Sequence, residues 1–189
     1  MMSAAVNNNN RFHPLKFGLW LGIASIIMLF AALTSAYIVR KAQGNWVEFK
    51  MPPVFWWNTL VIILSSITMQ WAVRSFRSFK ESTYKAALLI TFLLGVVFLA
   101  GQYLGWVDLG NRGIYIDGNP SGSFVYVISG VHAVHILGGL IIMLIMLIQI
   151  LVRPFNPNKL VGVQMMATYW HFVDVLWIYL FIFFQINLS

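Results

Sequence analysis

The sequence predicts an all-α integral membrane protein, a bundle of five transmembrane helices. Its 189 residues are 60% hydrophobic and only 9% charged, whereas a soluble domain carries about 25% charged residues. The apolar residues fall into five continuous runs, each long enough for the roughly 20-residue helix that crosses a bilayer. Apolar and polar residues do not alternate within these runs, so the runs are typical of helices and not of barrel strands.

The five apolar runs and the segments between them define the expected elements. We expect helices at about 17–39, 55–73, 86–107, 124–152 and 163–186. Pro52 and Pro53 precede the second run and block helical continuation across them. The longest connection, 108–123, is rich in glycine and is typical of turns. We expect residues 1–15 to form a polar, disordered tail and residues 16–189 to form a single membrane domain.

Lysines and arginines lie mainly at the ends of the apolar runs, and their distribution predicts an orientation. Basic residues in short loops favour the cytoplasmic side. The side that holds the N-terminus carries eight: Arg11, Lys16, Arg74, Arg77, Lys80, Lys85, Arg153 and Lys159. The opposite side carries four: Arg40, Lys41, Lys50 and Arg112. We therefore expect the N-terminus in the cytoplasm and the C-terminus outside. Because the net charge of +7 arises from these helix ends, it indicates no nucleic-acid partner.

Small residues spaced four apart predict where helices approach each other closely, because lipid provides no hydrophobic drive for helix association. Gly18 and Gly22 have this spacing in the first helix, and Gly101 and Gly105 have it in the third. The fourth helix carries a cluster of small residues: Ser129, Gly130, Ala133, Gly138 and Gly139. We expect helix contacts at these positions.

The fifth predicted helix carries an acid near its middle. His171 and Asp174 are three residues apart and share a helical face, while Trp170, Asp174 and Trp177 follow the i, i+4, i+7 stripe, so the indole rings flank the acid. An aspartate at the centre of a spanning helix costs roughly 2.5–3.5 kcal/mol on insertion scales. Asp174 is therefore expected to face protein, with His171 as the nearest candidate partner. We interpret the pair as a polar contact between helices; a proton or ligand site is the alternative.

Three histidines within the predicted helices are candidates for a metal or haem site. His132 and His135 lie three apart on the fourth helix, and His171 lies on the fifth. Imidazole is the commonest ligand for zinc, copper and haem iron. Haem with two histidine ligands usually takes one from each of two facing helices, so His171 facing His132 and His135 would allow a single haem at most. The sequence has no cysteine, which excludes thiolate ligation. We favour histidines that are hydrogen-bonded between helices or that face lipid headgroups, with no metal and no catalytic residue in this chain.

Several stretches resemble subunit III of the haem-copper terminal oxidases. The most specific is residues 169–177, Tyr-Trp-His-Phe-Val-Asp-Val-Leu-Trp, which resembles the last helix of that family. Residues 130–139, Gly-Val-His-Ala-Val-His-Ile-Leu-Gly-Gly, resemble its histidine-rich helix. Shorter stretches earlier in the chain, at 13–18, 23–40, 58–66 and 94–106, resemble the family's earlier segments and occur in the same order.

The resemblance implies the short, five-helix bacterial form of this subunit, in the cytoplasmic membrane. It implies a non-catalytic component of a cytochrome c oxidase that steadies the catalytic subunit, binds phospholipid and supports proton uptake. The haems and copper would belong to subunits I and II, and the complex could join a larger respiratory supercomplex. The positions expected to be structural or lipid-associated are Gln102, Trp106, His132, His135, Trp170, His171 and Asp174.

Three alternatives stay open beside this interpretation. One is an accessory subunit of a nitric oxide reductase or a quinol oxidase. The others are a histidine-ligated membrane cytochrome and a small proton-coupled transporter built around His171 and Asp174. Two positions also depart from the family pattern, since Ile26 and Gly105 stand where the family often has glutamates. A role of those acids in proton delivery does not carry over to this chain.

Overall fold

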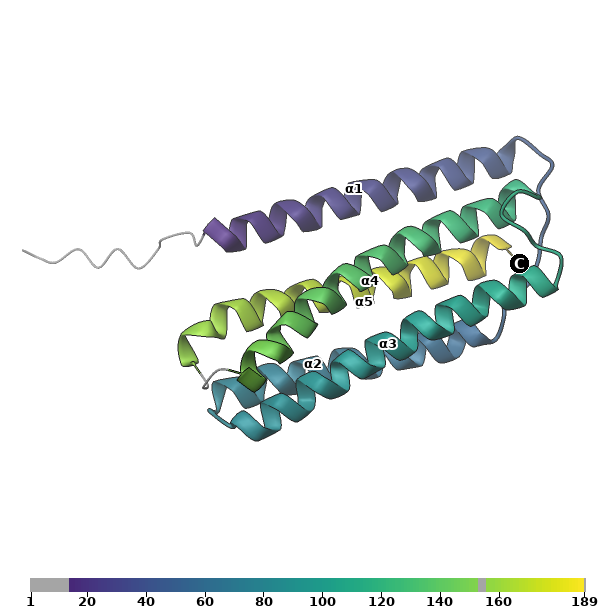
Figure 1. Ribbon diagram of the computed structural model, residues 1–189. Helices are drawn as coiled ribbons and strands as arrows, with labels where there is room; N and C mark the ends of the chain where they lie inside the picture. Colours follow the sequence, from purple (N-terminus) through teal and green to yellow (C-terminus); the bar gives the residue numbers. More distant parts are fainter. Residues whose placement is uncertain (1–13, 153–155, 189) are drawn as a thin grey trace, which may run out of the picture.

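The computed structural model describes residues 14–152 and 156–188, and it consists of five long helices joined by short connections (Figure 1). They are α1 (Pro14–Ala42), α2 (Val54–Arg77), α3 (Glu81–Asn111), α4 (Pro120–Val152) and α5 (Leu160–Leu188), with a short 3₁₀ turn at Pro157–Lys159 before α5. Each of the five is long and apolar enough to cross a membrane. The described residues contain no strand. The predicted fold class is thereby confirmed.

Four of the helices extend beyond the predicted apolar runs at both ends, and α4 does so at its start. The extension reaches five residues at the start of α3, which begins at Glu81. The prediction counted the residues that hydrocarbon requires, whereas backbone hydrogen bonding continues into the headgroup region, where polar side chains are solvated. Residues 1–13 of the predicted tail lie outside the described residues. Its last two residues, Pro14 and Leu15, belong to α1. Proline suits this first position because its missing N–H would have no helical partner.

The helices alternate in direction, so the bundle has two ends. The N-terminal face, as we call it, holds the starts of α1, α3 and α5 and the ends of α2 and α4; the C-terminal face lies opposite. Helices α4 and α5 lie between α1 on one side and the α2–α3 pair on the other (Figure 1). Helix α1 packs against α4 and α5 through four buried residues: Ile23, Phe30, Thr34 and Tyr37.

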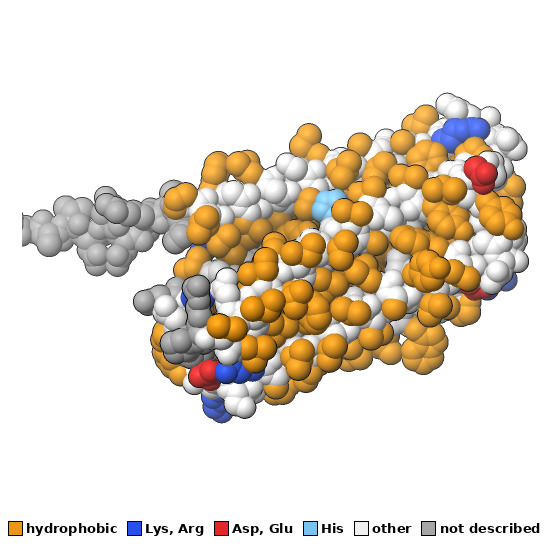
Figure 2. All heavy atoms as spheres, viewed as in Figure 1, with side chains coloured by type: hydrophobic (Ala, Val, Ile, Leu, Met, Phe, Trp, Pro, Cys, Tyr) orange, Lys and Arg blue, Asp and Glu red, His pale blue; other side chains and the backbone are white. Residues whose placement is uncertain are grey.

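The surface is that of a protein surrounded by lipid. Figure 2 shows hydrophobic side chains across the middle of one face, with charged side chains near the two ends of the bundle. Large apolar side chains such as Met28, Ile67 and Val134 are mostly exposed. A soluble protein of this size would not leave so much apolar surface in water, so the chain is a multi-pass membrane protein.

The helix contacts predicted at Gly101 and Gly105 exist, whereas those predicted at Gly18, Gly22 and Gly138 do not. A Cβ atom at Gly101 would overlap Asn58 of α2, and one at Gly105 would lie 2.6 Å from the Phe55 ring. These glycines allow α3 to approach α2 closely. Gly18 and Gly22, in contrast, have no atom within 4 Å of an added Cβ. The contact predicted for them is wrong, because α1 turns another face toward α4 and α5.

Candidate functional site

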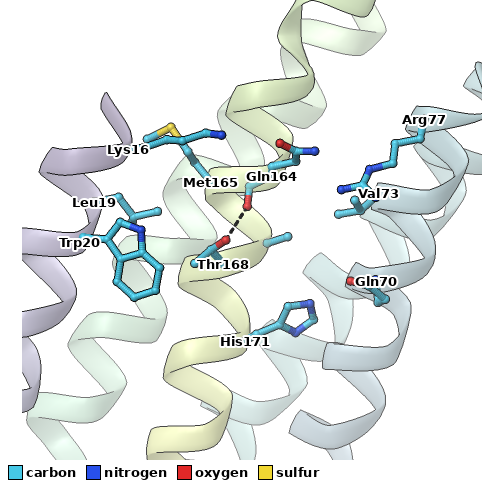
Figure 3. A pocket seen from close by; sticks show the side chains of 11 residues that line it. Lys16, Leu19, Trp20, Gln70, Val73, Arg77, Gln164, Met165, Thr168 and His171 are labelled. Atoms are coloured by element: carbon cyan, nitrogen blue, oxygen red, sulfur yellow. Dashed lines mark hydrogen bonds between the residues drawn. The ribbon is translucent and has the colours of Figure 1, made fainter. Parts of the chain in front are cut away.

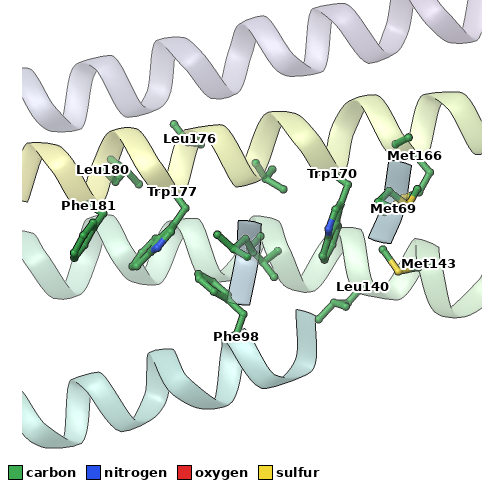
Figure 4. Close-up of a cluster of buried hydrophobic side chains, with 14 of the residues drawn as sticks. Met69, Phe98, Leu140, Met143, Met166, Trp170, Leu176, Trp177, Leu180 and Phe181 are labelled. Atoms are coloured by element: carbon green, nitrogen blue, oxygen red, sulfur yellow. The ribbon is translucent and has the colours of Figure 1, made fainter. Parts of the chain in front are cut away.

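Trp170, in the middle of α5, joins that helix to three others. Its side chain is fully buried (0% exposed), and its indole Nε1–H donates a hydrogen bond to Ser65 Oγ of α2 at 2.9 Å. The ring also occupies the space left by two glycines: an added Cβ would lie 2.9 Å from it at Gly95 of α3 and 3.0 Å from it at Gly139 of α4. Figure 4 shows the ring projecting from α5 into the core.

Trp177 repeats this arrangement two turns further along α5. Its Nε1–H donates to Thr59 Oγ1 of α2 at 3.1 Å. The centroid of its ring lies 5.1 Å from that of Phe98 on α3 and 5.2 Å from that of His132 on α4, distances typical of aromatic packing. Both tryptophans therefore use the indole N–H to bind α2 and the ring to fill the space toward α3 and α4.

Asp174 lies on α5 between the two tryptophans. It is only 2% exposed, and neither carboxyl oxygen has a hydrogen-bond partner within the described part of the chain. The prediction that His171 would be its partner is wrong. The Ser66 hydroxyl of α2 lies near the carboxyl group, but without the geometry of a hydrogen bond. A polar group buried without a partner in this way is unusual and invites a functional explanation.

His171 is bonded to α2 instead. Its Nδ1 lies 2.6 Å from Ser66 Oγ, a short hydrogen-bond distance. The side chain is half-buried, and it lines a pocket described below. His171 and Asp174 thus share one neighbour, Ser66, although they do not bind each other. Sequence reasoning missed Ser66, because a serine in a membrane helix carries no signal of its own.

The histidines of α4 do not join His171. His132 is fully buried among the rings of Phe30, Phe98 and Trp177, and neither of its nitrogens has a partner among the described residues. His135 Nδ1 lies 2.7 Å from the backbone oxygen of Val131. Over residues 14–152 and 156–188, no group of three or more His, Cys, Asp or Glu residues is placed to hold a metal ion.

Gln102 and Trp106 both lie on α3, but only Trp106 has a hydrogen-bond partner for its side chain among the described residues. Gln102 is 1% exposed, and neither its amide nitrogen nor its oxygen is hydrogen-bonded within the described segments. Trp106 Nε1–H donates to Ser129 Oγ at 2.9 Å and so links α3 to α4. The seven residues singled out in the sequence therefore comprise two tryptophans that link helices, three histidines with different neighbours, and two polar groups without a hydrogen-bond partner.

A pocket of about 350 Å³ opens between α1, α2 and α5 toward the N-terminal face (Figure 3). Lys16 of α1 and Arg77 of α2 carry its positive charge, and neither has an ion-pair partner in the described parts of the chain. Leu19 and Trp20 supply an apolar wall, and His171 lines its deeper part. The pocket combines three helices distant in sequence, so no linear motif could predict it.

These features define a class: a five-helix membrane bundle in which some inner polar side chains connect helices and others are buried without a hydrogen-bond partner among the described residues. The sequence profile described as "Cytochrome c oxidase subunit III" matches residues 5–187, so the chain belongs to that family. The family membership expected from residues 130–139 and 169–177 is confirmed.

Three relatives show the range of similarity. "Probable cytochrome c oxidase subunit 3" of Nocardia farcinica is 34% identical, over 93% of this chain and 89% of the relative. "Cytochrome c oxidase subunit 3" of Corynebacterium diphtheriae is 30% identical, over 92% and 88%. "Probable quinol oxidase subunit 3" of Staphylococcus saprophyticus is 26% identical, over 88% and 85%.

Proposed function

We propose that this chain is the non-catalytic subunit III of a proton-pumping cytochrome c oxidase in a bacterial cytoplasmic membrane. The family match over residues 5–187 carries this proposal. The haems and copper would be bound by subunits I and II, and the chain would steady the catalytic subunit and support proton uptake. The seven polar and aromatic residues described above would then be structural or lipid-associated positions. Three of the five residues that have ring nitrogens, Trp106, Trp170 and His171, are hydrogen-bonded to a neighbouring helix through that ring, which supports this role.

A quinol oxidase is the second candidate. The relative of that name from Staphylococcus saprophyticus supports it, at a lower identity of 26%. The two candidates differ in the electron donor and not in the role of this chain. Oxidation of reduced cytochrome c, compared with oxidation of a quinol, by the purified complex distinguishes them.

Affinity purification through a tag on this chain, in a mild detergent, tests the proposal. We expect a large haem- and copper-bearing polypeptide to co-purify with it. The haem absorption should follow that polypeptide when the complex is dissociated. A chain that purifies alone, or that keeps a haem absorption band of its own after dissociation, would contradict the proposal.

We also propose that the pocket between α1, α2 and α5 binds an anionic phospholipid. Lys16 and Arg77 would bind the phosphate group, and Leu19 and Trp20 would contact the acyl chains. Basic side chains near the membrane surface attract anionic lipids at about 1 kcal/mol each. Lys16→Ala combined with Arg77→Ala should reduce the anionic phospholipid that co-purifies, measured by native mass spectrometry. Lys80→Ala is the matched control, because Lys80 is exposed near the same face but does not line the pocket.

The proposed orientation places the N-terminal face in the cytoplasm. Support comes from the basic residues, of which more lie toward that face than toward the other. The sequence has no native cysteine, so single cysteines introduced by Lys80→Cys and Arg112→Cys report on the two faces without background from this chain. In intact cells, a membrane-impermeant maleimide should label the Arg112→Cys variant and not the Lys80→Cys variant. The reverse labelling would overturn the orientation.

A further inference from the structure

Asp174 is a buried carboxyl group that has no hydrogen-bond partner among the residues that the structure describes. The other four acidic residues, Glu48, Glu81, Asp108 and Asp117, lie in connections or near helix ends. A carboxylate buried in apolar surroundings without a counter-charge costs far more free energy than the neutral carboxylic acid. Ionisable residues inside a membrane frequently mark a route for protons. The question is whether this carboxyl group has access to water.

Ser66 connects Asp174 to His171. The serine hydroxyl comes from α2, and its oxygen lies 2.6 Å from His171 Nδ1 on α5. The same hydroxyl lies near the Asp174 carboxyl group, within its electrostatic reach. A hydroxyl group has one donor and two acceptor sites. Ser66 binds the imidazole in this structure, and a small movement of its side chain would bring the hydroxyl group into a hydrogen bond with the carboxyl group.

His171 connects Ser66 to the pocket at the N-terminal face. The imidazole lines that pocket together with Gln164, which lies two helical turns nearer the start of α5. Seven residues of helix rise by about 10 Å, so the pocket extends inward by roughly that distance from its polar mouth. Since Nδ1 is bonded to Ser66, Nε2 is the nitrogen available to water in the pocket. Figure 3 shows the His171 ring beyond Gln164 and Thr168, directed toward the α2 side of the pocket.

No other charged group approaches Asp174 from the helices packed around it. On α4, the buried imidazole of His132 is enclosed by aromatic rings. The Tyr169 hydroxyl donates to the backbone oxygen of His135 and so points to α4. The charged residues of α1, α2 and α3 within the described chain lie near the helix ends: Lys16, Arg40, Lys41, Arg74, Arg77, Glu81, Lys85 and Asp108. His171, through Ser66, is therefore the titratable side chain best placed to exchange a proton with Asp174.

We propose that Asp174 is a proton-binding site that exchanges its proton with the N-terminal face of the membrane through Ser66 and His171. In the inward direction, Nε2 of His171 takes a proton from water and Nδ1 passes one to Ser66 Oγ. Ser66 releases its own hydroxyl proton to the Asp174 carboxylate. One proton is gained by Asp174 and one is lost by water, while Ser66 and His171 return to their original charge. Release follows the reverse order: Asp174 returns a proton through Ser66 to Nδ1, and Nε2 gives one to water, which restores the starting tautomer of the imidazole.

Hydrogen–deuterium exchange of the carboxyl group, followed by infrared spectroscopy, tests this proposal. The full chain in its native assembly is labelled with aspartate that carries an isotope at the carboxyl carbon. The wild-type spectrum minus that of Asp174→Asn isolates the C=O band of a protonated Asp174. We expect such a band, and we expect it to shift when the sample is transferred to D₂O. A difference spectrum that shows a carboxylate in place of a protonated carboxyl group over the whole working pH range would overturn the proposal.

Variants of two adjacent serines test the route. Ser66→Ala should keep the band but slow its deuterium shift on the order of a hundredfold, the lower end of what a positioned proton donor contributes. Ser66→Thr retains a hydroxyl group and should restore the fast exchange. Ser65→Ala is the matched control: its hydroxyl binds Trp170 and not His171, so exchange should remain at the wild-type rate. Equal exchange rates in Ser66→Ala and Ser65→Ala would overturn the route.

These measurements stand apart from the test of the proposed function. They follow one carboxyl group of this chain, whichever redox protein binds it. If Asp174→Asn does not assemble, Asp174→Glu provides the reference spectrum, because a glutamate at this position does not carry the isotope label. Failure of the proton site would therefore leave the subunit proposal intact, and the converse also holds.

Discussion

Asn58 of α2 occupies the space that a side chain at Gly101 of α3 would need. The carboxamide carbon of Asn58 lies 2.8 Å from the position of a Cβ at Gly101, and the amide oxygen lies closer still. The Asn58 Nδ2–H group also donates to the backbone oxygen of Phe98 at 3.3 Å. One polar side chain thus satisfies the α3 backbone while the missing side chain of the glycine lets the two helices meet.

Gly101→Ala should therefore destabilise the bundle. The new methyl group displaces Asn58 and breaks its bond to Phe98, and overpacking of this kind costs about 1–3 kcal/mol. Gly138→Ala is the control, because an added Cβ there has no atom within 4 Å. Thermal unfolding of the purified protein in detergent should show a lower midpoint for Gly101→Ala alone. Equal midpoints would mean that the α2–α3 contact is looser than the structure indicates.

Trp170→Phe should destabilise the chain by about 2 kcal/mol. The substitution removes the hydrogen bond to Ser65 Oγ, typically worth about 0.6 kcal/mol in a membrane, and leaves a cavity against Gly95 and Gly139. Ser65→Ala removes this hydrogen bond and the long one from Ser65 Oγ to the backbone oxygen of Thr91 (3.5 Å), but it leaves the indole ring in place, so it should cost less than Trp170→Phe. Trp57→Phe is the control, because Trp57 is 70% exposed. Chemical unfolding in mixed micelles would measure all three, and an equal loss for Trp57→Phe would contradict the buried role of Trp170.

His132→Phe should leave stability unchanged or raise it. Neither ring nitrogen of His132 has a partner in the described chain, and replacing an unsatisfied buried polar group by an apolar one of similar shape removes a desolvation cost. His171→Phe, by contrast, breaks the bond to Ser66 and should lower the unfolding midpoint. The comparison requires only thermal unfolding of the two variants. A marked loss in His132→Phe would reveal a buried partner for that imidazole, such as an internal water molecule.

Lys41→Met should loosen the end of α1. The Lys41 ammonium group donates to the backbone oxygen of Asn187 at 2.6 Å and so ties α1 to the end of α5. Methionine keeps the length of the side chain but not the donor. Backbone amides near residues 34–42 should exchange with deuterium several times faster, because weakly packed segments open locally. Lys50→Met, at an exposed position on the same face, should have no such effect.

Much of the fold follows from the sequence because the bilayer imposes a simple rule. Every backbone polar group must be satisfied within the membrane, so a long apolar run becomes a helix whatever its neighbours are. The same reasoning correctly places Asp174 inside the protein, since an acid facing lipid is too costly. The motif at residues 169–177 also indicates the protein family, because its order of residues is specific enough to be identified without a structure.

The partners of the polar residues were decided by the tertiary structure. A spacing of three residues brings His171 and Asp174 to one face of α5, but it does not determine which neighbouring helix meets that face. Ser66 of α2 binds the imidazole and leaves the carboxyl group without a hydrogen bond. In the same way, glycine pairs with identical spacing have different surroundings: Gly101 packs against α2, whereas Gly18 faces open space. Local spacing describes one helix, whereas a contact depends on the rotation and position of two.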